Sequence, residues 1–489
     1  MKRFGLATVA LLLAVIAVVV VRGTRAAPPA LPAEKLAPLA VDAAAAAEHL
    51  AALLRFETVS KQDGAPDLAT FDRLRGMLEA TYAKLHAALV HERAGEDGGS
   101  LLYTWKGSDP TAKPLLFMAH LDVVPVEPGI AWTEPPFAGK IAGGFVWGRG
   151  ALDDKSSVIG LCEAVEALLA TGYAPRRTIY LAFGHDEEVG GRRGASRMAA
   201  LLESRGVKPE LVLDEGLFIV HGVLEGAPAP VAMIGIAEKG YASVELLVES
   251  AGGHSSMPPP ETAVGILAGA LSRLEHAQMP TRLAGAPRQL FETVAPFMPA
   301  WKRLVLTNLW LFSPMVQRSL AGKPTTNALV RTTTAPTILE GSVKDNVLAT
   351  RARAVVNFRI LPGDSVAGVV AHVNAAVNDN RVRVTLLQTT VSEPSPQAST
   401  ESAGYSSIVQ AIHQTFPDVL VAPGLMVAAT DSRHMRVLGA DTYRFAPHVL
   451  AAEDLKRIHG TDERIALTDL EQGIRFYAQV IRNADAATR

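Results

Sequence analysis

The sequence is poor in cysteine, in aromatic residues and in net charge. Its 489 residues include one cysteine and 6% aromatic residues, and the formal net charge is −2. A single cysteine excludes an internal disulfide, and a near-neutral chain without a long basic run gives no reason to expect nucleic acid as a partner. Cys162 shares a helical stripe with Val158, Leu161 and Val165, which predicts a small buried hydrophobic residue rather than a nucleophile.

The chain does have enough apolar sequence for more than one folded core. Hydrophobic residues make up 48% of it, which excludes a disordered protein and allows two or three domains. An apolar run from Gly5 to Val21 follows Lys2 and Arg3 and precedes Arg22. Its length of about 17 residues suits a signal peptide or a short membrane anchor, and both interpretations stay open. Either one predicts an exported protein, membrane-anchored or secreted and periplasmic.

The rest of the sequence predicts a catalytic domain interrupted by an insert. We divide the chain into residues 1–36 (signal or anchor with linker), 37–238 and 392–489 (catalytic domain) and 239–391 (insert). In residues 37–238, amphipathic helices alternate with short apolar strands, which predicts an α/β fold with helices on both faces of a mostly parallel sheet. The insert predicts a βαββαβ unit, with strands at 242–249, 328–338, 353–360 and 381–387 and helices at 261–275 and from 364.

One apolar segment of the insert, Met279 to Lys323, belongs to neither pattern. It includes Trp301, Trp310 and Met315 among few charged residues. The simplest interpretation is a helical hairpin packed on its own domain. The alternatives are an apolar wall for a lipid-like substrate and a membrane-contacting patch.

Five acidic or imidazole residues follow apolar runs or loops in order along the chain: His120, Asp153, Glu188, Asp214 and His459. The carboxyl ends of strands in an open α/β sheet form the crevice where ligands bind. Imidazole and carboxylate ligands without thiolate suit zinc, with manganese or cobalt as alternatives. A helix cap or a salt bridge would explain any one of these carboxylates, but the ordered set predicts a two-metal hydrolase site.

Several motifs together carry a family resemblance: HLDVVP, GRGALDDKS, GHDEEVGG, DEG, GGHSSMPP, NFRILPGD and TDSRHM. Over nearly the whole chain after Ala37, the sequence resembles the dinuclear zinc peptidase family that includes carboxypeptidase S, the aminoacylases and bacterial deacylases. It looks closest to the secreted N-fatty-acyl-amino-acid synthase/hydrolases and to carboxypeptidase S. The resemblance implies a zinc-peptidase catalytic domain, an inserted lid or dimerisation domain, and two Zn²⁺ ions per subunit.

The resemblance also implies residue roles. His120 and Asp214 would bind one metal, Glu188 and His459 the other, and Asp153 would bridge them. Two catalytic residues would assist: Glu187 as the general base and Asp122 as its supporting acid behind His120. Candidates for substrate binding are His254, Asn327, Arg359 and Arg433, with His254 reaching an active site across a dimer interface and the arginines binding a free carboxylate.

These inferences predict an enzyme that cleaves the amide bond of N-acyl amino acids with long or aromatic acyl chains. Since amide hydrolysis is reversible, synthesis is an additional expectation when both products are concentrated. The alternative enzyme is a carboxypeptidase or dipeptidase that takes short peptides. A non-catalytic metal- or peptide-binding protein is the alternative from another class. Expected partners are a small-molecule substrate, a membrane tether and a second copy of the chain.

Overall fold

The computed structural model describes residues 2–26, 39–61 and 64–487. Its larger sheet has eight strands in the order β1-β2-β6-β3-β7-β16-β8-β15. Strands β6, β3, β7 and β16 run parallel to one another, and β1 and β2 extend the sheet with antiparallel pairings. The bounds are β1 (Val90–Ala94), β2 (Ser100–Trp105), β3 (Leu115–His120), β6 (Ile179–Gly184), β7 (Leu211–His221), β8 (Val231–Glu238), β15 (Leu420–Met426) and β16 (Asp441–Ala451).

Helices cover both faces of this sheet, as the sequence predicted. Along β3, Leu115 and Phe117 join one buried cluster while Leu116 and Met118 join another, because successive strand side chains point to opposite faces. The first cluster is formed with α2 (Ala43–Leu54), α3 (Leu68–Thr81), α4 (Ala83–Ala88), α5 (Lys155–Ala170), α13 (Ala403–Thr415) and α14 (Leu467–Ala486). The second is formed with α6 (Ala195–Ser204) and η3 (Asp431–Leu438). Cys162 is buried on α5, where a hydrophobic role was expected.

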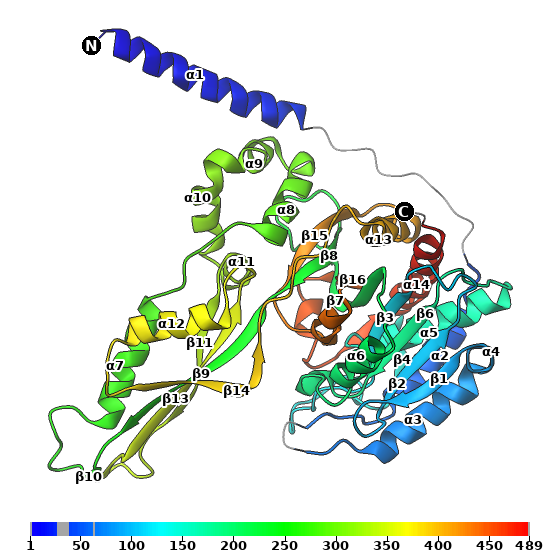
Figure 1. Cartoon of the computed structure of the whole chain (residues 1–489), viewed down its shortest axis with the longest axis horizontal. Coiled ribbons are helices and arrows are strands. Elements are labelled where there is room, and N and C mark those ends of the chain that lie inside the picture. Colours follow the sequence, from blue (N-terminus) through cyan, green and yellow to red (C-terminus); the bar gives the residue numbers. More distant parts are fainter. Residues whose placement is uncertain (1, 27–38, 62–63, 488–489) are drawn as a thin grey trace.

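The insert forms a second sheet with the expected βαββαβ order (Figure 1). Its antiparallel strands are ordered β11-β13-β9-β14, and two helices cover one face through a separate apolar cluster. The bounds are β9 (Gly240–Glu249), α7 (Ala263–His276), β11 (Thr333–Glu340), β13 (Arg351–Ile360), α12 (Val366–Val377) and β14 (Arg383–Ser392). The chain passes from the large sheet to the small one at Lys239, a buried residue whose ammonium donates to the carbonyls of Ala328 and Arg331.

The strand predicted from Ala328 begins later than expected. Residues 324–330 form a helix, α11 (Pro324–Val330), and the strand starts at Thr333. Pro324 stands at the first helical position, where its missing N–H costs no hydrogen bond and its fixed φ suits the helix. The apolar residues that follow Pro324 therefore belong to a helix, and the strand begins after it.

The apolar segment 279–323 is helical, and it packs on the large sheet as well as on α11 of its own insert. It forms α8 (Gly285–Val294), η2 (Ala295–Phe297), α9 (Ala300–Leu306) and α10 (Leu309–Leu320). Leu290, Phe291 and Val294 pack against Val231 of β8 and Leu420 of β15. The segment thus covers the edge of the large sheet, where β15 would otherwise expose an unpaired strand. The expected helical hairpin contacts its own insert through Val330, but much of its apolar surface packs on the catalytic domain instead.

Candidate metal centre

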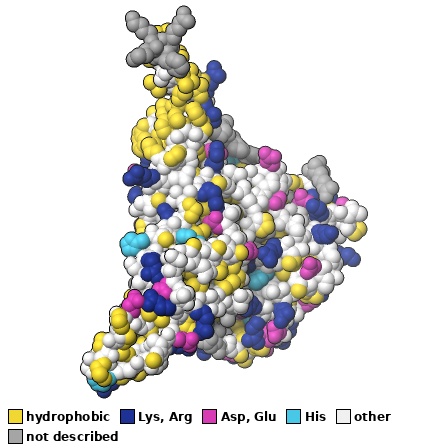
Figure 2. All heavy atoms as spheres, turned by 60° about the vertical axis from the view of Figure 1, so that its left-hand side comes forward, with side chains coloured by type: hydrophobic (Ala, Val, Ile, Leu, Met, Phe, Trp, Pro, Cys, Tyr) yellow, Lys and Arg dark blue, Asp and Glu magenta, His cyan; other side chains and the backbone are white. Residues whose placement is uncertain are grey.

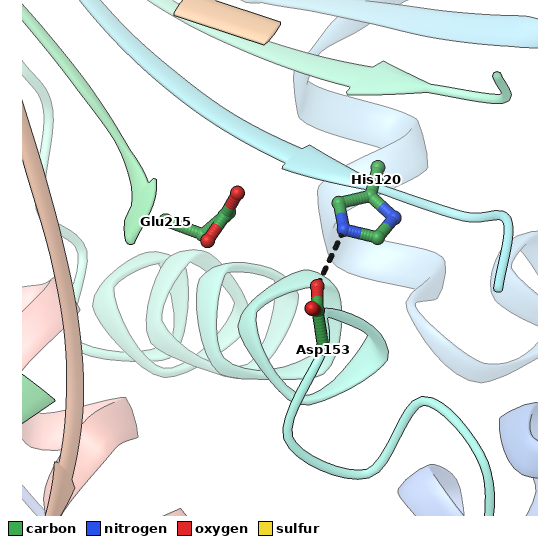
Figure 3. A group of neighbouring side chains, drawn as sticks. All are labelled: His120, Asp153 and Glu215. Atoms are coloured by element: carbon green, nitrogen blue, oxygen red, sulfur yellow. Dashed lines mark hydrogen bonds and ion pairs between the residues drawn. The ribbon is translucent and has the colours of Figure 1, made fainter. Parts of the chain in front are cut away.

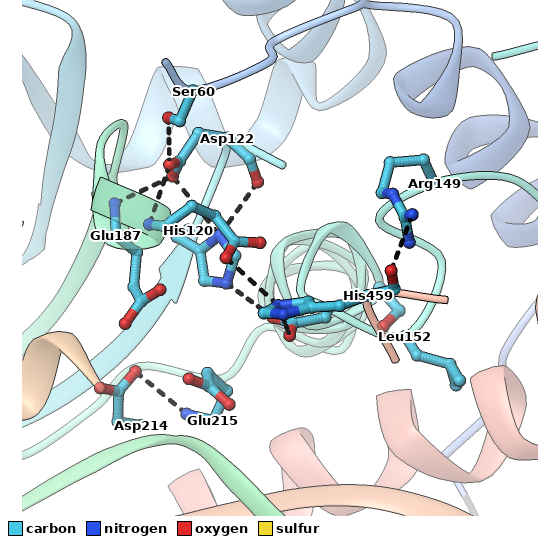
Figure 4. A network of polar contacts seen from close by, with 12 residues as sticks. Ser60, His120, Asp122, Arg149, Leu152, Glu187, Asp214, Glu215 and His459 are labelled. Atoms are coloured by element: carbon cyan, nitrogen blue, oxygen red, sulfur yellow. Dashed lines mark hydrogen bonds and ion pairs between the residues drawn. The ribbon is translucent and has the colours of Figure 1, made fainter. Parts of the chain in front are cut away.

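The candidate ligands come from strand ends and loops that meet above the large sheet (Figure 4). His120 is the last residue of β3, and Glu187 and Glu188 open η1 (Glu187–Val189) just after the neighbouring parallel strand β6. Asp153 lies in the loop that leads into α5, and His459 lies in the loop after β16. Parallel strands β3, β6 and β7 deliver their carboxyl ends to one edge, which brings distant segments of the chain to one place.

Asp153 lies at the centre of this group, with one carboxylate oxygen near each imidazole. Its Oδ1 is 2.8 Å from His120 Nε2, and its Oδ2 is 3.1 Å from His459 Nε2. The His459 Nε2 atom is also 3.2 Å from Glu188 Oε2. Two sets of ligand atoms each lie within 4.8 Å of one another, and Asp153 belongs to both. The first is His120, Asp153 and Glu215 (Figure 3), and the second is Asp153, Glu188 and His459.

The strand β7 contributes Glu215, not the expected Asp214, to the first set. Successive residues of a strand point to opposite faces, so only one of the pair can face His120. The Asp214 carboxylate instead accepts hydrogen bonds from the backbone N–H groups of Ser432 (2.8 Å) and Glu215 (3.0 Å). These contacts fasten the Thr430–Ser432 segment to β7, and the metal-binding role of Asp214 stays a prediction. The adjacent acidic residues of DEG were the available signal for Glu215.

Asp122 lies behind His120 and is fully buried. Its backbone carbonyl is 3.0 Å from His120 Nδ1, and its Oδ1 is 3.4 Å from the same atom. The carboxylate also accepts the Ser60 hydroxyl (2.6 Å) and the backbone N–H groups of Glu187 and Glu188 (both 3.1 Å). Asp122 therefore fixes the orientation of the His120 ring and the position of η1 at the same time.

A buried ion pair that the sequence analysis missed holds two of the candidate ligands. Glu463 Oε2 is 2.6 Å from Arg149 Nη1, and its Oε1 accepts the N–H groups of Leu152 (2.8 Å) and Asp153 (3.1 Å). The Arg149 guanidinium also donates to the backbone carbonyl of His459 at 3.2 Å. His459 has a φ of +60°, a backbone conformation that residues other than glycine adopt at some energetic cost. The pair thus clamps the Asp153 loop to the His459 loop.

The electrostatics of the group favour a cation. Burial raises the pKa of Glu188 and of Glu215, and Asp153 adds to both shifts because its charge repels theirs. Hydrogen bonds that His459 donates to the carboxylates of Asp153 and Glu188 raise its pKa to about 10. The Oε1 atom of Glu188 is buried without a hydrogen-bond partner. Clustered carboxylates, two imidazoles and an unpaired buried oxygen suit a divalent ion such as zinc.

A cleft of about 760 Å³ opens beside the group, between the large sheet and the insert. Glu187, Glu188 and His459 line it on one side, and Tyr241 and Arg359 of the insert line it on the other. Burial raises the pKa of Glu187 well above that of an exposed glutamate, and the nearby charges of Asp431 and Glu188 act in the same direction. A side chain with such a pKa accepts a proton and retains it long enough to pass it on.

Two of the four predicted substrate-binding residues lie in this cleft. Arg359 stacks its guanidinium 4.8 Å from the centre of the Tyr241 ring, and Arg433 lines the same space. The positive charge of Arg433 is close enough to lower the pKa of Arg359, an effect secondary to burial. Neither guanidinium forms an ion pair with any residue that the structure describes. They are therefore available to an anionic ligand.

The other two predicted residues lie elsewhere. His254 is exposed in the two-residue strand β10 (Gly253–His254), which pairs with β12 (Val347–Leu348) at the far end of the insert (Figure 1). Its Nδ1 is 2.8 Å from the Ser256 hydroxyl. Asn327 lies on α11, and its side-chain oxygen accepts a hydrogen bond from Arg331. Neither lines the cleft of this chain, and neither does any residue of segment 279–323.

The chain matches a known protein family and is similar to individual relatives over most of its length. Residues 116–483 match the model of peptidase family M20/M25/M40. The chain is 41% identical over 447 residues to probable carboxypeptidase S-like 2 of Dictyostelium discoideum, covering 90% of this chain and 85% of the relative. It is 41% identical over 435 residues to N-fatty-acyl-amino acid synthase/hydrolase PM20D1.1 of Danio rerio, covering 88% and 84%.

Solved structures share the fold at much lower sequence identity. The M20 family metallo-carboxypeptidase Sso-CP2 from Sulfolobus solfataricus superposes with a TM-score of 0.66 at 18% identity, covering 90% of this chain and 99% of the other. Human carnosine dipeptidase 1 superposes with a TM-score of 0.62 at 16% identity, covering 91% and 97%. The eight-stranded sheet with an inserted second sheet is therefore a known architecture.

Proposed function

Because the chain belongs to peptidase family M20/M25/M40 and is a metal-dependent hydrolase, we propose that it hydrolyses the amide bond of N-acyl amino acids. The observation that carries this proposal is the position of Asp153, which is shared by two groups of ligand atoms beside the cleft that Glu187 lines. Relatives named N-fatty-acyl-amino acid synthase/hydrolases support the substrate class. Synthesis from acid and amine is the reverse of the same reaction.

In this proposal two zinc ions would occupy the centre, with manganese or cobalt as substitutes. His120 and Glu215 would hold one ion and Glu188 and His459 the other, while Asp153 belongs to both groups of ligand atoms. A pair of divalent ions lowers the pKa of water and polarises the amide carbonyl. Asp122 keeps the His120 ring in place by accepting from its Nδ1–H, and this leaves Nε2 free for a metal.

Glu187 moves the proton. Its carboxylate points into the space shared with His120 and Glu215 (Figure 4), and it takes a proton from the attacking water. The raised pKa keeps that proton on Glu187 until the amide nitrogen receives it and leaves as an amine. Asp122 supports this step indirectly, because its oxygens hold the backbone N–H groups of Glu187 and Glu188.

The same cleft offers a place for each end of the substrate. Arg359 and Arg433 provide planar guanidinium groups for the free carboxylate of the amino acid. The acyl chain lies along the apolar part of the lining, which consists of Val189, Ala199, Ala200, Val391, Ala428, Ala429 and Val437. The segment with Trp301 is not part of this lining, so its role is not that of an acyl wall.

A carboxypeptidase or dipeptidase activity is the second candidate, because it needs the same metals, base and carboxylate site. Relatives named carboxypeptidase S and carboxypeptidase S-like favour it. For either activity, His254 is proposed to act in the cleft of a second copy, since the far end of the insert presents it to solvent. A non-catalytic binding role is disfavoured, because Glu187 and every proposed ligand are present.

A hydrolysis screen of the full-length protein tests the proposal. Long-chain N-acyl amino acids and dipeptides are compared after chelation and after zinc is added back. Metal-dependent release of fatty acid, abolished in Glu187→Gln, is the expected result. Cleavage of dipeptides alone would assign the second candidate instead. Turnover that persists in Glu187→Gln with metal bound would remove the assigned base.

A further inference from the structure

The N-terminal helix α1 (Lys2–Arg25) and the helices α9 and α10 form one apolar surface at the upper end of the molecule (Figures 1 and 2). An 18-residue window within residues 6–25 of α1 has a mean hydropathy of 2.6, and only 11% of that window is buried. A helix of 20 residues is about 30 Å long, which matches the hydrocarbon core of a bilayer. Most of α1 is therefore free to face lipid.

The C-terminal part of α1 is seated directly on α9. A Cβ atom at Gly23 would lie 3.2 Å from Leu304 Cα, so the two backbones approach closely. The buried side chain of Asn308 donates to the carbonyl of Val19 at 3.0 Å and to that of Leu304 at 2.9 Å. This contact fixes α9 beside the last turns of α1, at the depth where a spanning helix leaves the hydrocarbon.

The outer face of the same helices carries large apolar side chains that the protein leaves uncovered. Trp301 is 67% exposed, Trp310 50%, Leu311 41% and Met315 54%. On α10, Leu311 and Met315 are four residues apart and share a face, while Val316 points inward. Trp310 donates its indole N–H to Asn308, which leaves the apolar part of its ring outward. Tryptophan in such a position is characteristic of membrane interfaces.

The charges around this surface suit a bilayer better than a protein partner. No acidic residue occurs between Glu292 and Glu340. Arg303, Arg318 and Lys323 form no ion pair with any residue in the described ranges. Long basic side chains beside apolar ones extend to lipid phosphates while their stems stay in the apolar layer. A second copy would bring the same positive charges together, and it would have to share the surface with a helix of spanning length.

We infer that the α9–α10 hairpin, Ala300–Leu320, lies in the membrane leaflet on the enzyme's side, next to α1. The protein is then held at the lipid surface by two elements, a spanning helix and an in-plane hairpin, rather than by a flexible tether alone. In-plane amphipathic helices with Trp, Leu and flanking basic residues bind membranes in this way. This position of the α9–α10 hairpin does not depend on the substrate proposed above.

Tryptophan quenching in vesicles tests this inference, because α1 contains no tryptophan and the chain has five in total. The full-length protein is reconstituted into vesicles of phosphatidylcholine and phosphatidylglycerol with bromine on the acyl chains, either near the headgroup or near the methyl end. Bromine near the headgroup should quench the emission of two of the five tryptophans. That quenching should disappear in the W301F/W310F variant, while circular dichroism stays unchanged.

Three further variants make a negative result decisive. Leu13→Trp in the W301F/W310F background places an indole on α1, and quenching by the deeper bromines then verifies that α1 is inserted. Leu311→Asp with Met315→Asp should reduce the quenching of Trp310, whereas the matched control Leu339→Asp, on exposed β11, should not. Equal quenching of wild type and W301F/W310F, with Leu13→Trp quenched, would overturn the inference. So would self-association in detergent that shields both tryptophans from a soluble quencher.

Discussion

The clamp between Arg149 and Glu463 gives the sharpest test of how this centre is assembled. Both side chains are buried, with 3% and 0% of their surface exposed. In Glu463→Gln the amide oxygen can still accept from Leu152 and Asp153, but the NH₂ group then faces the Arg149 guanidinium. Removing one partner of a buried ion pair costs about 3–5 kcal/mol. Part of that cost should appear as a lower free energy of unfolding. The rest should appear as displacement of the Asp153 and His459 loops, which weakens metal binding.

Displacement of the two loops is measured as a loss of metal affinity. Partners that orient metal ligands typically change affinity by about 10–100-fold, which corresponds to about 1.4–2.7 kcal/mol. We therefore expect Glu463→Gln to bind zinc about 10–100-fold more weakly in a chelator competition. Urea unfolding of the metal-free protein should show the remaining loss, about 1–2 kcal/mol. Arg149→Met should behave alike, and the double variant should lose less than the sum, with a coupling of about 1–3 kcal/mol.

A matched control separates clamping from ordinary destabilisation. Glu245 pairs with Arg353 on the insert sheet and touches none of the candidate ligands. Glu245→Gln should lower stability without changing zinc affinity. The reasoning would be refuted by a Glu463→Gln variant that binds zinc as tightly as wild type, or by additive effects of the two single variants at the clamp.

Four other outcomes follow from the structure. Glu187→Gln should keep its metal in elemental analysis and lose about 10²–10⁴-fold in kcat; metal loss instead would make it a ligand. Glu215→Gln should weaken zinc binding more than Asp214→Asn does, and the reverse order would make Asp214 the ligand, as the sequence predicts. Arg359→Gln should raise KM about 10–200-fold for substrates with a free carboxylate, from a lost charged hydrogen bond, and leave their methyl esters unaffected. Burial lowers the pKa of Lys239 to about 7, so its unfolded form binds more protons than its folded form between pH 7 and about 10.4. Lys239 should therefore make stability rise with pH there by at most about 1.4 kcal/mol per unit. Lys239→Met should reduce the slope in thermal unfolding without abolishing it, because burial also lowers the pKa of Lys155 to about 7.

The sequence was sufficient to predict that most of the candidate ligands gather at one edge of the large sheet. The segments carrying His120, Glu188 and Asp214 are apolar runs that stop on ligand-type residues, and parallel strands bring their ends to one edge. The βαββαβ order of the insert followed from the same periodicities, and both were found. These features depend on local patterns that few folds can accommodate, so they could be read without coordinates.

The sequence could not decide between neighbouring residues on a strand buried on both faces. The run before Asp214 is apolar at every position, so no alternation of polar and apolar residues marks which side faces the helices. Only the pairing of β7 in the sheet turned Glu215 toward His120 and Asp214 toward Ser432. In a strand buried on both faces, the neighbouring strands determine which residues point to each side of the sheet.

Contacts across long stretches of chain also required the tertiary structure. Arg149 and Glu463 are 314 residues apart, and although Arg149 belongs to the GRGALDDKS motif, nothing in the sequence pairs it with Glu463. Likewise, amphipathic sequence in α8 predicts that one face is buried but not which surface covers it, and the answer was the edge strand β15. The sequence by itself determined the chemistry of the ligands and the order of the elements, because both are written in local residue patterns. The tertiary structure decided which side chains meet and which apolar faces stay open, because those depend on how separate elements pack.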